Sequence, residues 1–407
     1  MLVARRAIEE LADFYEISPE LHWIDPKTPS DARAQLLDLV IRSGKPVTGH
    51  GLFNSLGSED DLPRREALEA LVERDAREFG FRHYSEHLGF TADRGAEAVL
   101  PLPLPMGEAT AQLVASNLRR LRSRLGPGGR VAFENSAFLT PLGDPTLEPE
   151  FLGRICELAD CGLVLDLHNA HCNCVNANMS LDDWLGRVPW ERVVEIHLSG
   201  GSWSDPAWLE SGERRLLDTH DDVVPEPVWE ACEQALAWAP SLGGIVLEWL
   251  GLREDQAPAH EADLIRARQL WASRPRAAAP PRRTPRDLLP QPTPALAREV
   301  LLGAVLADDS PHALSEDLDR RADSLLREAF AGIDEEGLRL TTLIVKRLRC
   351  ERILLGDGRC RVDFEADPRD FTERFRSYDR LSPSSTPWPA GESVAFASYC
   401  DGLGAGS

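Results

Sequence analysis

Side chains that can bind metal ions recur at the ends of short apolar segments in this chain of 407 residues. The candidate donors are His50, His87, Glu134, Asp166, Asn169, His197, Asp218, His220 and Glu248. Imidazole and oxygen donors, with no thiolate at a segment end, suit Fe(II), Mn(II) or Zn(II). The set is larger than one ion needs, so we predict two or three metal ions with at least one bridging carboxylate.

The repetition of the pattern favours metal binding over core packing. A single histidine at such a place is often just a hydrogen-bonded core residue. Six successive segments that end in this way are harder to explain, because a buried carboxylate or imidazole is costly unless it is paired or bound to a cation. Several carboxylates in one place also repel each other, and a multiply charged cation removes that repulsion.

The segments that carry these donors are typical of β-strands that alternate with helices. We expect strands at residues 14–18, 46–50, 83–87, 130–134, 163–167, 193–198 and 245–249, and helices at 5–12, 64–79, 107–125, 148–160 and 226–239. This alternation predicts a parallel sheet in a TIM-like β/α barrel, whose strand ends meet at one mouth. A doubly wound open sheet is the structural alternative, but no GxGxxG motif follows any strand.

Composition limits the remaining classes of function. A net charge of −22 opposes binding to nucleic acid, because affinity for a phosphate backbone comes from Lys and Arg. No apolar run approaches the roughly 20 residues that cross a bilayer, and the N-terminus lacks the pattern of a secretory signal. We therefore expect a cytoplasmic protein with no membrane partner, whose eight cysteines are free thiols.

The composition changes after Trp271, which predicts three parts: a catalytic barrel at 1–273, a linker rich in Pro and Arg at 274–294, and a mainly helical domain at 295–407. Within the last part we expect helices at 295–306, 314–331, 335–348 and 368–378, an extended stretch at 361–364 and a loose tail from 381. Phe371, Phe375 and Tyr378 lie at helical spacing, which fits a core better than a binding groove.

An ordered set of motifs resembles the multinuclear non-heme iron-dependent oxidative enzymes that modify ribosomally made peptides, a family with a member in methanobactin biosynthesis. The resemblance runs from about residue 13 to 249. Its motifs are FYEISPE at 14–20, GHGL at 49–52, SLGS at 55–58, SEHL at 85–88, LPLP at 100–103, EN at 134–135, LD at 165–166, EIHL at 195–198, DTH at 218–220, VW at 228–229 and LEW at 247–249.

The resemblance implies two or three iron ions, with O2 as co-substrate, and oxidation of a residue, Cys by preference, in a precursor peptide. Glu134, Asp166, His197 and Glu248 would hold one iron and carry the catalysis. His50 and His87 would hold a second iron with Glu134 as the bridge, and Asn169, Asp218 and His220 would hold a third. A leader-binding partner protein, or the fused C-terminal region, would capture the peptide.

The chain departs from the family pattern in three places. It begins with a helix instead of a Gly-rich strand, so we expect either a barrel without its first strand or a start placed too late. His168 stands two residues after Asp166, where relatives commonly have Asn, and adds a candidate ligand. We expect Cys172 and Cys174 in a loop near the mouth, where a filling role and a redox or metal role are both open.

Two other functions fit the donor set. A zinc or manganese barrel that acts as a sugar isomerase or phosphoesterase also lines its mouth with His, Asp and Glu. A metal-binding scaffold without catalytic activity is the alternative outside the enzymes. Metal content, colour and dependence on O2 discriminate among the three.

Overall fold

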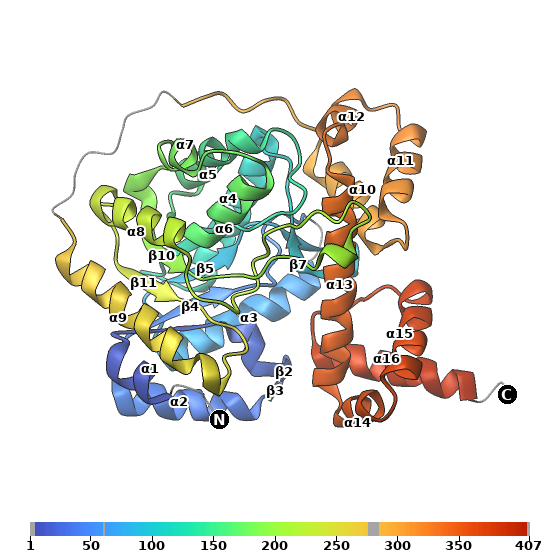
Figure 1. The fold of residues 1–407 in the computed structure, drawn as a ribbon, viewed down its shortest axis with the longest axis horizontal. Coiled ribbons are helices and arrows are strands. Elements are labelled where there is room, and N and C mark those ends of the chain that lie inside the picture. The colour runs from blue at the N-terminus through green and yellow to red at the C-terminus, as the bar shows by residue number, and fades with distance from the viewer. Residues whose placement is uncertain (1–4, 60–61, 276–284, 405–407) are drawn as a thin grey trace.

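A computed structural model describes residues 5–59, 62–275 and 285–404 of the chain (Figure 1). Seven strands form one parallel sheet in the order β1-β4-β5-β8-β9-β10-β11. They are β1 (Tyr15–Ile17), β4 (Val47–Gly51), β5 (Tyr84–His87), β8 (Val131–Glu134), β9 (Gly162–Asp166), β10 (Val193–Leu198) and β11 (Gly244–Leu247). The sheet follows chain order, as in a β/α barrel, and all seven predicted strands are present within two residues of the expected bounds.

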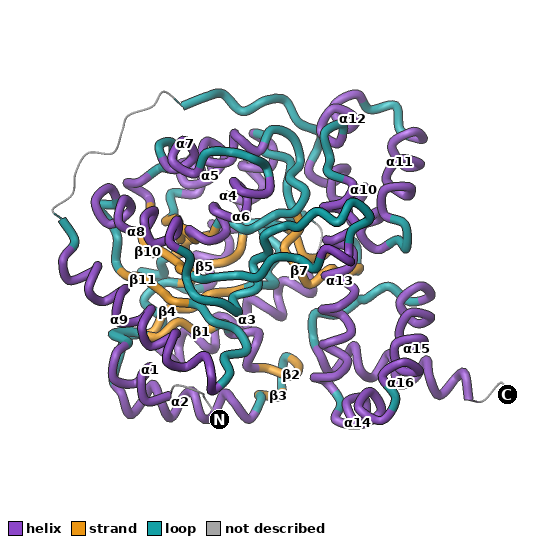
Figure 2. The backbone as a smooth tube through the Cα atoms, viewed as in Figure 1, coloured by secondary structure: helices purple, strands orange, loops and turns teal. Residues whose placement is uncertain are grey.

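Helices surround this sheet, whose strands gather at the centre of the molecule (Figure 2). They are α1 (Arg5–Leu11), α2 (Asp31–Ser43), α3 (Leu62–Phe79), α4 (Glu108–Arg124), α5 (Glu148–Ala159), α6 (Leu167–Asn176), α7 (Leu181–Leu185), α8 (Glu226–Trp238) and α9 (Ala257–Ser273). The apolar faces of α4, α5 and α8 pack on the strands in one large buried cluster. The predicted TIM-like class is thus confirmed as a nearly closed barrel with seven parallel strands.

Two short hairpins lie outside the barrel sheet, and neither of them is predicted from the sequence. One joins β2 (Trp23–Asp25) to β3 (Thr28–Pro29), and the other joins β6 (Phe90–Asp93) to β7 (Ala96–Leu102). The β6–β7 turn is formed by Arg94 and Gly95, which both have positive φ angles of 46° and 84°. Such angles are those of the tight turns that join antiparallel strands.

The region after residue 293 is helical, as predicted. Its helices are α10 (Pro294–Leu306), α11 (Ser310–Arg320), α12 (Ser324–Phe330), α13 (Glu335–Gly356), α14 (Gly358–Ala366), α15 (Pro368–Leu381) and α16 (Pro389–Gly404). The long helix α13 runs between an upper group of helices, α10 to α12, and a lower group, α14 to α16 (Figure 1). Phe371, Phe375 and Tyr378 are buried together beside Phe396, so their role is core packing.

Four local expectations were wrong. Residues 361–364 belong to helix α14, and most of the tail after 381 forms helix α16, because both segments bury residues against α13 and α15. The single helix expected at 314–331 is in fact two helices, α11 and α12. Asp323 is the N-cap of α12, and its side chain accepts a hydrogen bond from the N–H of Leu326. Cys172 and Cys174 lie in helix α6 and not in a loop.

The helical region packs on the barrel through several contacts. Arg298 of α10 is buried, and it donates hydrogen bonds to Asp93 of β6 and to the carbonyl of Gly57. Leu340 of α13 packs against Leu209 and Leu217, which belong to the loop between β10 and α8. The division into 1–273, 274–294 and 295–407 stays a prediction, and residues 276–284 of the expected linker lie outside the described residues. None of the described helices combines the length and the apolar character that crossing a bilayer requires.

Candidate metal centre

The predicted donors converge on the C-terminal end of the barrel. The strand-borne donors are His50 on β4, His87 at the end of β5, Glu134 at the end of β8, Asp166 at the end of β9 and His197 on β10, with Glu248 directly after β11. A parallel sheet directs all these ends to one side, which explains how residues up to 198 positions apart meet.

Glu134 lies at the centre of this group and is fully buried. Its Oε2 is 3.1 Å from His50 Nε2 and 3.1 Å from His87 Nδ1. Its Oε1 is 3.2 Å from His197 Nδ1. One carboxylate therefore faces three imidazoles, as expected of a bridging ligand between two ions.

Two compact donor groups share Glu134 and His197. The first is His50, Glu134 and His197; the second is Glu134, Asp166, His197 and Glu248, and in each group one donor atom per residue lies within 4.8 Å of the others. The second group contains the same four residues that the family resemblance allots to one iron. The first contains His50 and Glu134, while His87 reaches the site through its contact with Glu134.

The three donors expected at a third ion are arranged more loosely. His220 Nε2 is 2.6 Å from Asp218 Oδ1, and His220 Nδ1 is 3.5 Å from Glu248 Oε2. Asn169 is buried on the first turn of α6, where its Nδ2 donates to the carbonyl of Asn135. In the described part of the chain, these three residues belong to neither compact group.

The donor atoms themselves indicate that the residues fit a metal. Buried polar atoms normally form hydrogen bonds, and each exception calls for an explanation. Several buried donor atoms of this site face one another in ion pairs, but they have no hydrogen bond of normal geometry to a described residue: His50 Nε2, both oxygens of Glu134, Asp166 Oδ2, Asn169 Oδ1, both ring nitrogens of His197, Asp218 Oδ1 and His220 Nε2. They belong to seven of the nine predicted donors, and metal coordination would satisfy them together.

The charges of the cluster also favour a cation. Burial opposes the charged imidazole of His50, but the carboxylates of Glu134 and Glu16 outweigh it and raise the pKa of His50 to about 10. Burial, together with Glu134, Asp218 and Glu248, raises the pKa of Asp166 well above its usual range. Protons thus balance the gathered carboxylates, and metal ions would take their place, since ligands must lose protons to bind a metal.

Neighbouring groups fix the orientation of these donors. Ser85 Oγ lies 2.8 Å from His50 Nδ1, so the other nitrogen of this ring is turned toward Glu134. Asp166 Oδ1 accepts a hydrogen bond from the backbone N–H of Asn169 and thereby caps α6. The other carboxylate oxygen of Asp166, Oδ2, remains available to the site. Such outer contacts set which atom of a ligand is presented to the metal.

His168, Cys172 and Cys174 lie on helix α6, and among the described residues they belong to none of the compact donor groups. His168 Nε2 lies 3.4 Å from Cys172 Sγ, with both residues buried. Burial raises the pKa of the Cys172 thiol well above its usual range and that of Cys174 to about 12. A thiol must lose its proton to bind a metal, and burial opposes that loss at both positions.

Three functional candidates in the barrel were missed. Glu16 on β1, Glu195 on β10 and His83 just before β5 form a layer beneath the mouth, on the other side of the His197 ring. Strand side chains alternate between faces, so Glu195 shares the inner face with His197 two residues later. That period of two is the signal in the sequence, and a rule that selects only strand-end donors does not include Glu16, Glu195 or His83.

The part of the chain that forms the barrel matches a known protein family. Residues 2–269 match the model of a family described as the RiPP precursor modification enzyme MbnB/TglH/ChrH. The chain belongs to this family. The match covers the barrel and confirms the resemblance inferred from the motifs, and it makes the chain a member of a family of peptide-modifying enzymes.

Members of the related UPF0276 group align with the same part of the chain. A UPF0276 protein of Rhizorhabdus wittichii is 32% identical over 225 residues, which cover 55% of this chain and 75% of the relative. One from Neisseria meningitidis serogroup B is 33% identical over 238 residues, or 58% and 79% of the two chains. One from Caulobacter vibrioides is 30% identical over 271 residues, or 65% and 88%.

Solved structures with a similar chain path are more distant. A D-psicose 3-epimerase crystallised in the presence of D-fructose is 13% identical with a TM-score of 0.43, and the alignment covers 67% of this chain and 95% of that one. A xylose isomerase domain protein from Planctomyces limnophilus is 14% identical with a TM-score of 0.43, with coverage of 66% and 90%. No inference about the chemistry of this chain follows from similarity at this level.

Proposed function

We propose that this protein is an iron- and O2-dependent enzyme that oxidises a cysteine residue in a ribosomally synthesised precursor peptide. Membership of the peptide-modifying family supports the substrate class. The observation that carries the metal assignment is the convergence of three imidazoles on Glu134. One ring nitrogen each of His50, His87 and His197 lies 3.1 to 3.2 Å from an oxygen of Glu134. Imidazole and carboxylate donors without a thiolate are a set that suits Fe(II).

The side chains divide the proposed centre into a closed and an open part. Glu134, Asp166 and His197 are shielded from solvent, and they would hold the inner ion in a dry environment. Glu248 and Asp218 are 19% and 24% exposed, so the outer edge of the centre faces the mouth. A peptide would therefore approach from the side of Asp218, His220 and Glu248.

Iron, when bound, supplies the reduction of O2 and the removal of a hydrogen atom from the carbon next to the sulfur. The chain's own contribution is placement and charge balance. Glu134 joins the two compact groups, so it would hold the ions that bind the two reactants close together. His50 is oriented by Ser85, and Asp166 is oriented by the first turn of α6. The substrate thiol would lose its proton more easily beside a metal ion.

We further propose that the helical region 295–407 captures the leader of the precursor. The loop between β10 and α8 contacts the start of α13 through two polar groups. Arg215 forms an ion pair of 2.7 Å with Asp334, directly before α13, and Ser211 donates a hydrogen bond to Glu336 of α13. A leader bound on this region would therefore hold the rest of the peptide beside the mouth. Tethering of this kind raises the effective concentration of the substrate at the centre.

The proposal is tested with enzyme reconstituted anaerobically with Fe(II) and then exposed to O2. The probes are the Cys-containing peptides that short open reading frames beside the gene encode, and the readout is the mass of each peptide. We expect a mass change that needs both iron and O2 and that disappears with Glu134→Gln. Full iron loading without any change in the peptide would contradict the oxidative function. Activity with Zn(II) in the absence of O2 would favour the hydrolytic or isomerase alternatives.

A further inference from the structure

A second group of metal-type donors lies inside the barrel beneath the proposed centre. It consists of Glu16, Glu195 and His197, and one donor atom of each lies within 4.8 Å of the others. Glu16 is the middle residue of β1, and Glu195 precedes His197 by two positions on β10. His197 is shared by both levels: its Nδ1 faces Glu134 and Glu248 above, and its Nε2 faces Glu16 and Glu195 below.

The spacing of these atoms matches that of ligands around one ion. His197 Nε2 is 3.4 Å from Glu16 Oε1 and 3.5 Å from Glu195 Oε1. Ring N–H···O bonds are normally about 2.9 Å long, whereas donors placed tetrahedrally at about 2.1 Å from one ion are about 3.4 Å apart. This nitrogen is fully buried and forms no hydrogen bond to a described residue.

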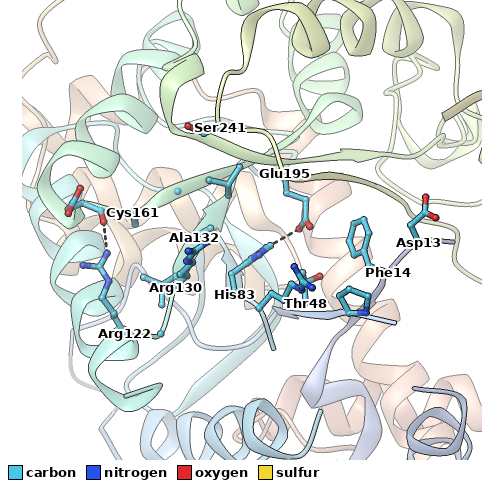
Figure 3. A pocket seen from close by; sticks show the side chains of 18 residues that line it. Asp13, Phe14, Thr48, His83, Arg122, Arg130, Ala132, Cys161, Glu195 and Ser241 are labelled. Carbon is cyan, nitrogen blue, oxygen red and sulfur yellow. Dashed lines mark hydrogen bonds and ion pairs between the residues drawn. The ribbon is translucent and has the colours of Figure 1, made fainter. Parts of the chain in front are cut away.

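A fourth donor stands at the lower edge of the group. His83 Nε2 is 3.2 Å from Glu195 Oε1 (Figure 3). Thr48 contributes a weaker contact, in which its Oγ1 lies 3.4 Å from Glu16 Oε2. Both residues line a cavity of about 590 Å³ at the N-terminal ends of the strands, opposite to the mouth. A hydrated ion could therefore reach this group from the far end of the barrel.

We propose that a divalent cation binds between Glu16, Glu195 and His197 Nε2, with His83 as a further ligand. The two carboxylates neutralise the ion, and the nitrogen and oxygen donors suit Zn²⁺, Mn²⁺, Co²⁺ or Fe²⁺. When both levels are filled, the ring of His197 bridges two ions, and each ring nitrogen releases the proton that it carried to solvent. The lower ion would fix His197, and with it one ligand of the upper centre. The inference does not rest on the oxidative function.

The test counts the Co²⁺ ions bound by the metal-stripped full-length protein. We expect the variant Glu16→Gln/Glu195→Gln to bind one Co²⁺ fewer than the wild type and to lose the corresponding part of the visible absorption. Glu230→Gln, an exposed carboxylate on α8, is the matched control and should bind as many ions as the wild type. Equal counts in the double variant and the wild type would overturn the proposal, even if the upper ions bound more weakly. In that case the two carboxylates would only orient His197.

Crystals of the Co²⁺-loaded wild type provide a second measurement that does not depend on the folding of a variant. We expect an anomalous peak between His197 Nε2, Glu16 and Glu195, in addition to peaks at the mouth. Peaks at the mouth alone would refute the lower site. A lower peak without any at the mouth would support it and contradict the metal centre of the proposed function, so the two failures are distinguishable.

Discussion

At the scale of single residues, the proposed site depends on groups that fix the orientation of a ligand side chain without binding the metal themselves. Ser85 is such a group, because its hydroxyl is the partner of His50 Nδ1. We predict that Ser85→Ala lowers metal affinity or activity by roughly 10- to 100-fold, as is usual for outer-shell partners. Isothermal titration with Fe(II) under nitrogen measures the effect. The same loss in the exposed control Ser123→Ala would contradict it.

A second residue, Glu148, predicts a dependence of stability on pH. Burial raises the pKa of Glu148 to about 7, although Trp184 and Asn173 donate hydrogen bonds to it. The folded pKa lies above the unfolded value of 4.5, so the contribution to stability is complete below about pH 4.5 and is lost as the pH rises through about 7. The loss amounts to about 3 kcal/mol for a shift of this size.

The comparison with Glu148→Gln isolates this contribution, because glutamine does not titrate. Between about pH 5 and about pH 8.5, the free energy of unfolding should fall by about 3 kcal/mol more in the wild type than in the variant. Urea unfolding at the two pH values measures the difference. Parallel changes in both proteins would show that Glu148 is not the titrating group.

The convergence of the residues at the strand ends could be predicted from the sequence, and their role as metal ligands stays a prediction. His50, Glu134, His197 and Glu248 could be found because each ends or follows an apolar strand, and parallel strands bring their ends together. Glu195 is buried and the side chain of Glu16 is 8% exposed, but both residues lie before the last residue of their strands, where the strand-end rule does not select them. Which nitrogen of His197 faces which carboxylate depends on coordinates and could not be predicted.

At the scale of elements, the helical region is attached to the barrel by a buried ion pair. Arg298 of α10 lies 3.2 Å from Asp93 of β6 and also binds the carbonyl of Gly57. We predict that Arg298→Met destabilises the protein by about 3 to 5 kcal/mol, because the Asp93 carboxylate loses its buried partner and keeps only the exposed Arg94 at 3.9 Å. Chemical denaturation measures the loss.

The double variant Arg298→Met/Asp93→Leu is the control for this prediction. It should recover most of the lost stability, since an apolar pair of similar volume carries no unpaired charge. If Arg298→Met alone left the stability unchanged, α10 would not be docked on the β6–β7 hairpin through this contact.

Element prediction failed where local composition disagreed with tertiary packing. The segment after residue 381 is rich in Ser, Pro and Gly, yet α16 forms because Phe396 is buried against Phe371 and Tyr378. Helix α6 consists largely of His, Asn and Cys, which are weak helix formers, and it is started by the cap that Asp166 provides. Burial and capping thus outweighed intrinsic propensity in both cases.

At the scale of the whole molecule, the order of strands and helices predicted the barrel, but not its relation to the helical region. Contacts such as Leu340 with Leu217 join residues far apart in the chain, and no local pattern signals them. Because Leu217 directly precedes Asp218, this packing supports the loop that carries two of the candidate ligands. The helical region is therefore part of the frame of the proposed centre.

The central claim is that the barrel mouth holds several ions bridged by Glu134. The most direct measurement is the number of irons retained per chain after anaerobic reconstitution and desalting, in the wild type, in Glu134→Gln and in the exposed control Glu157→Gln. We predict at least two irons in the wild type and the control, and the loss of at least one in Glu134→Gln. A wild type that retains fewer than two irons per chain, or a Glu134→Gln variant that retains the full number, would contradict the account.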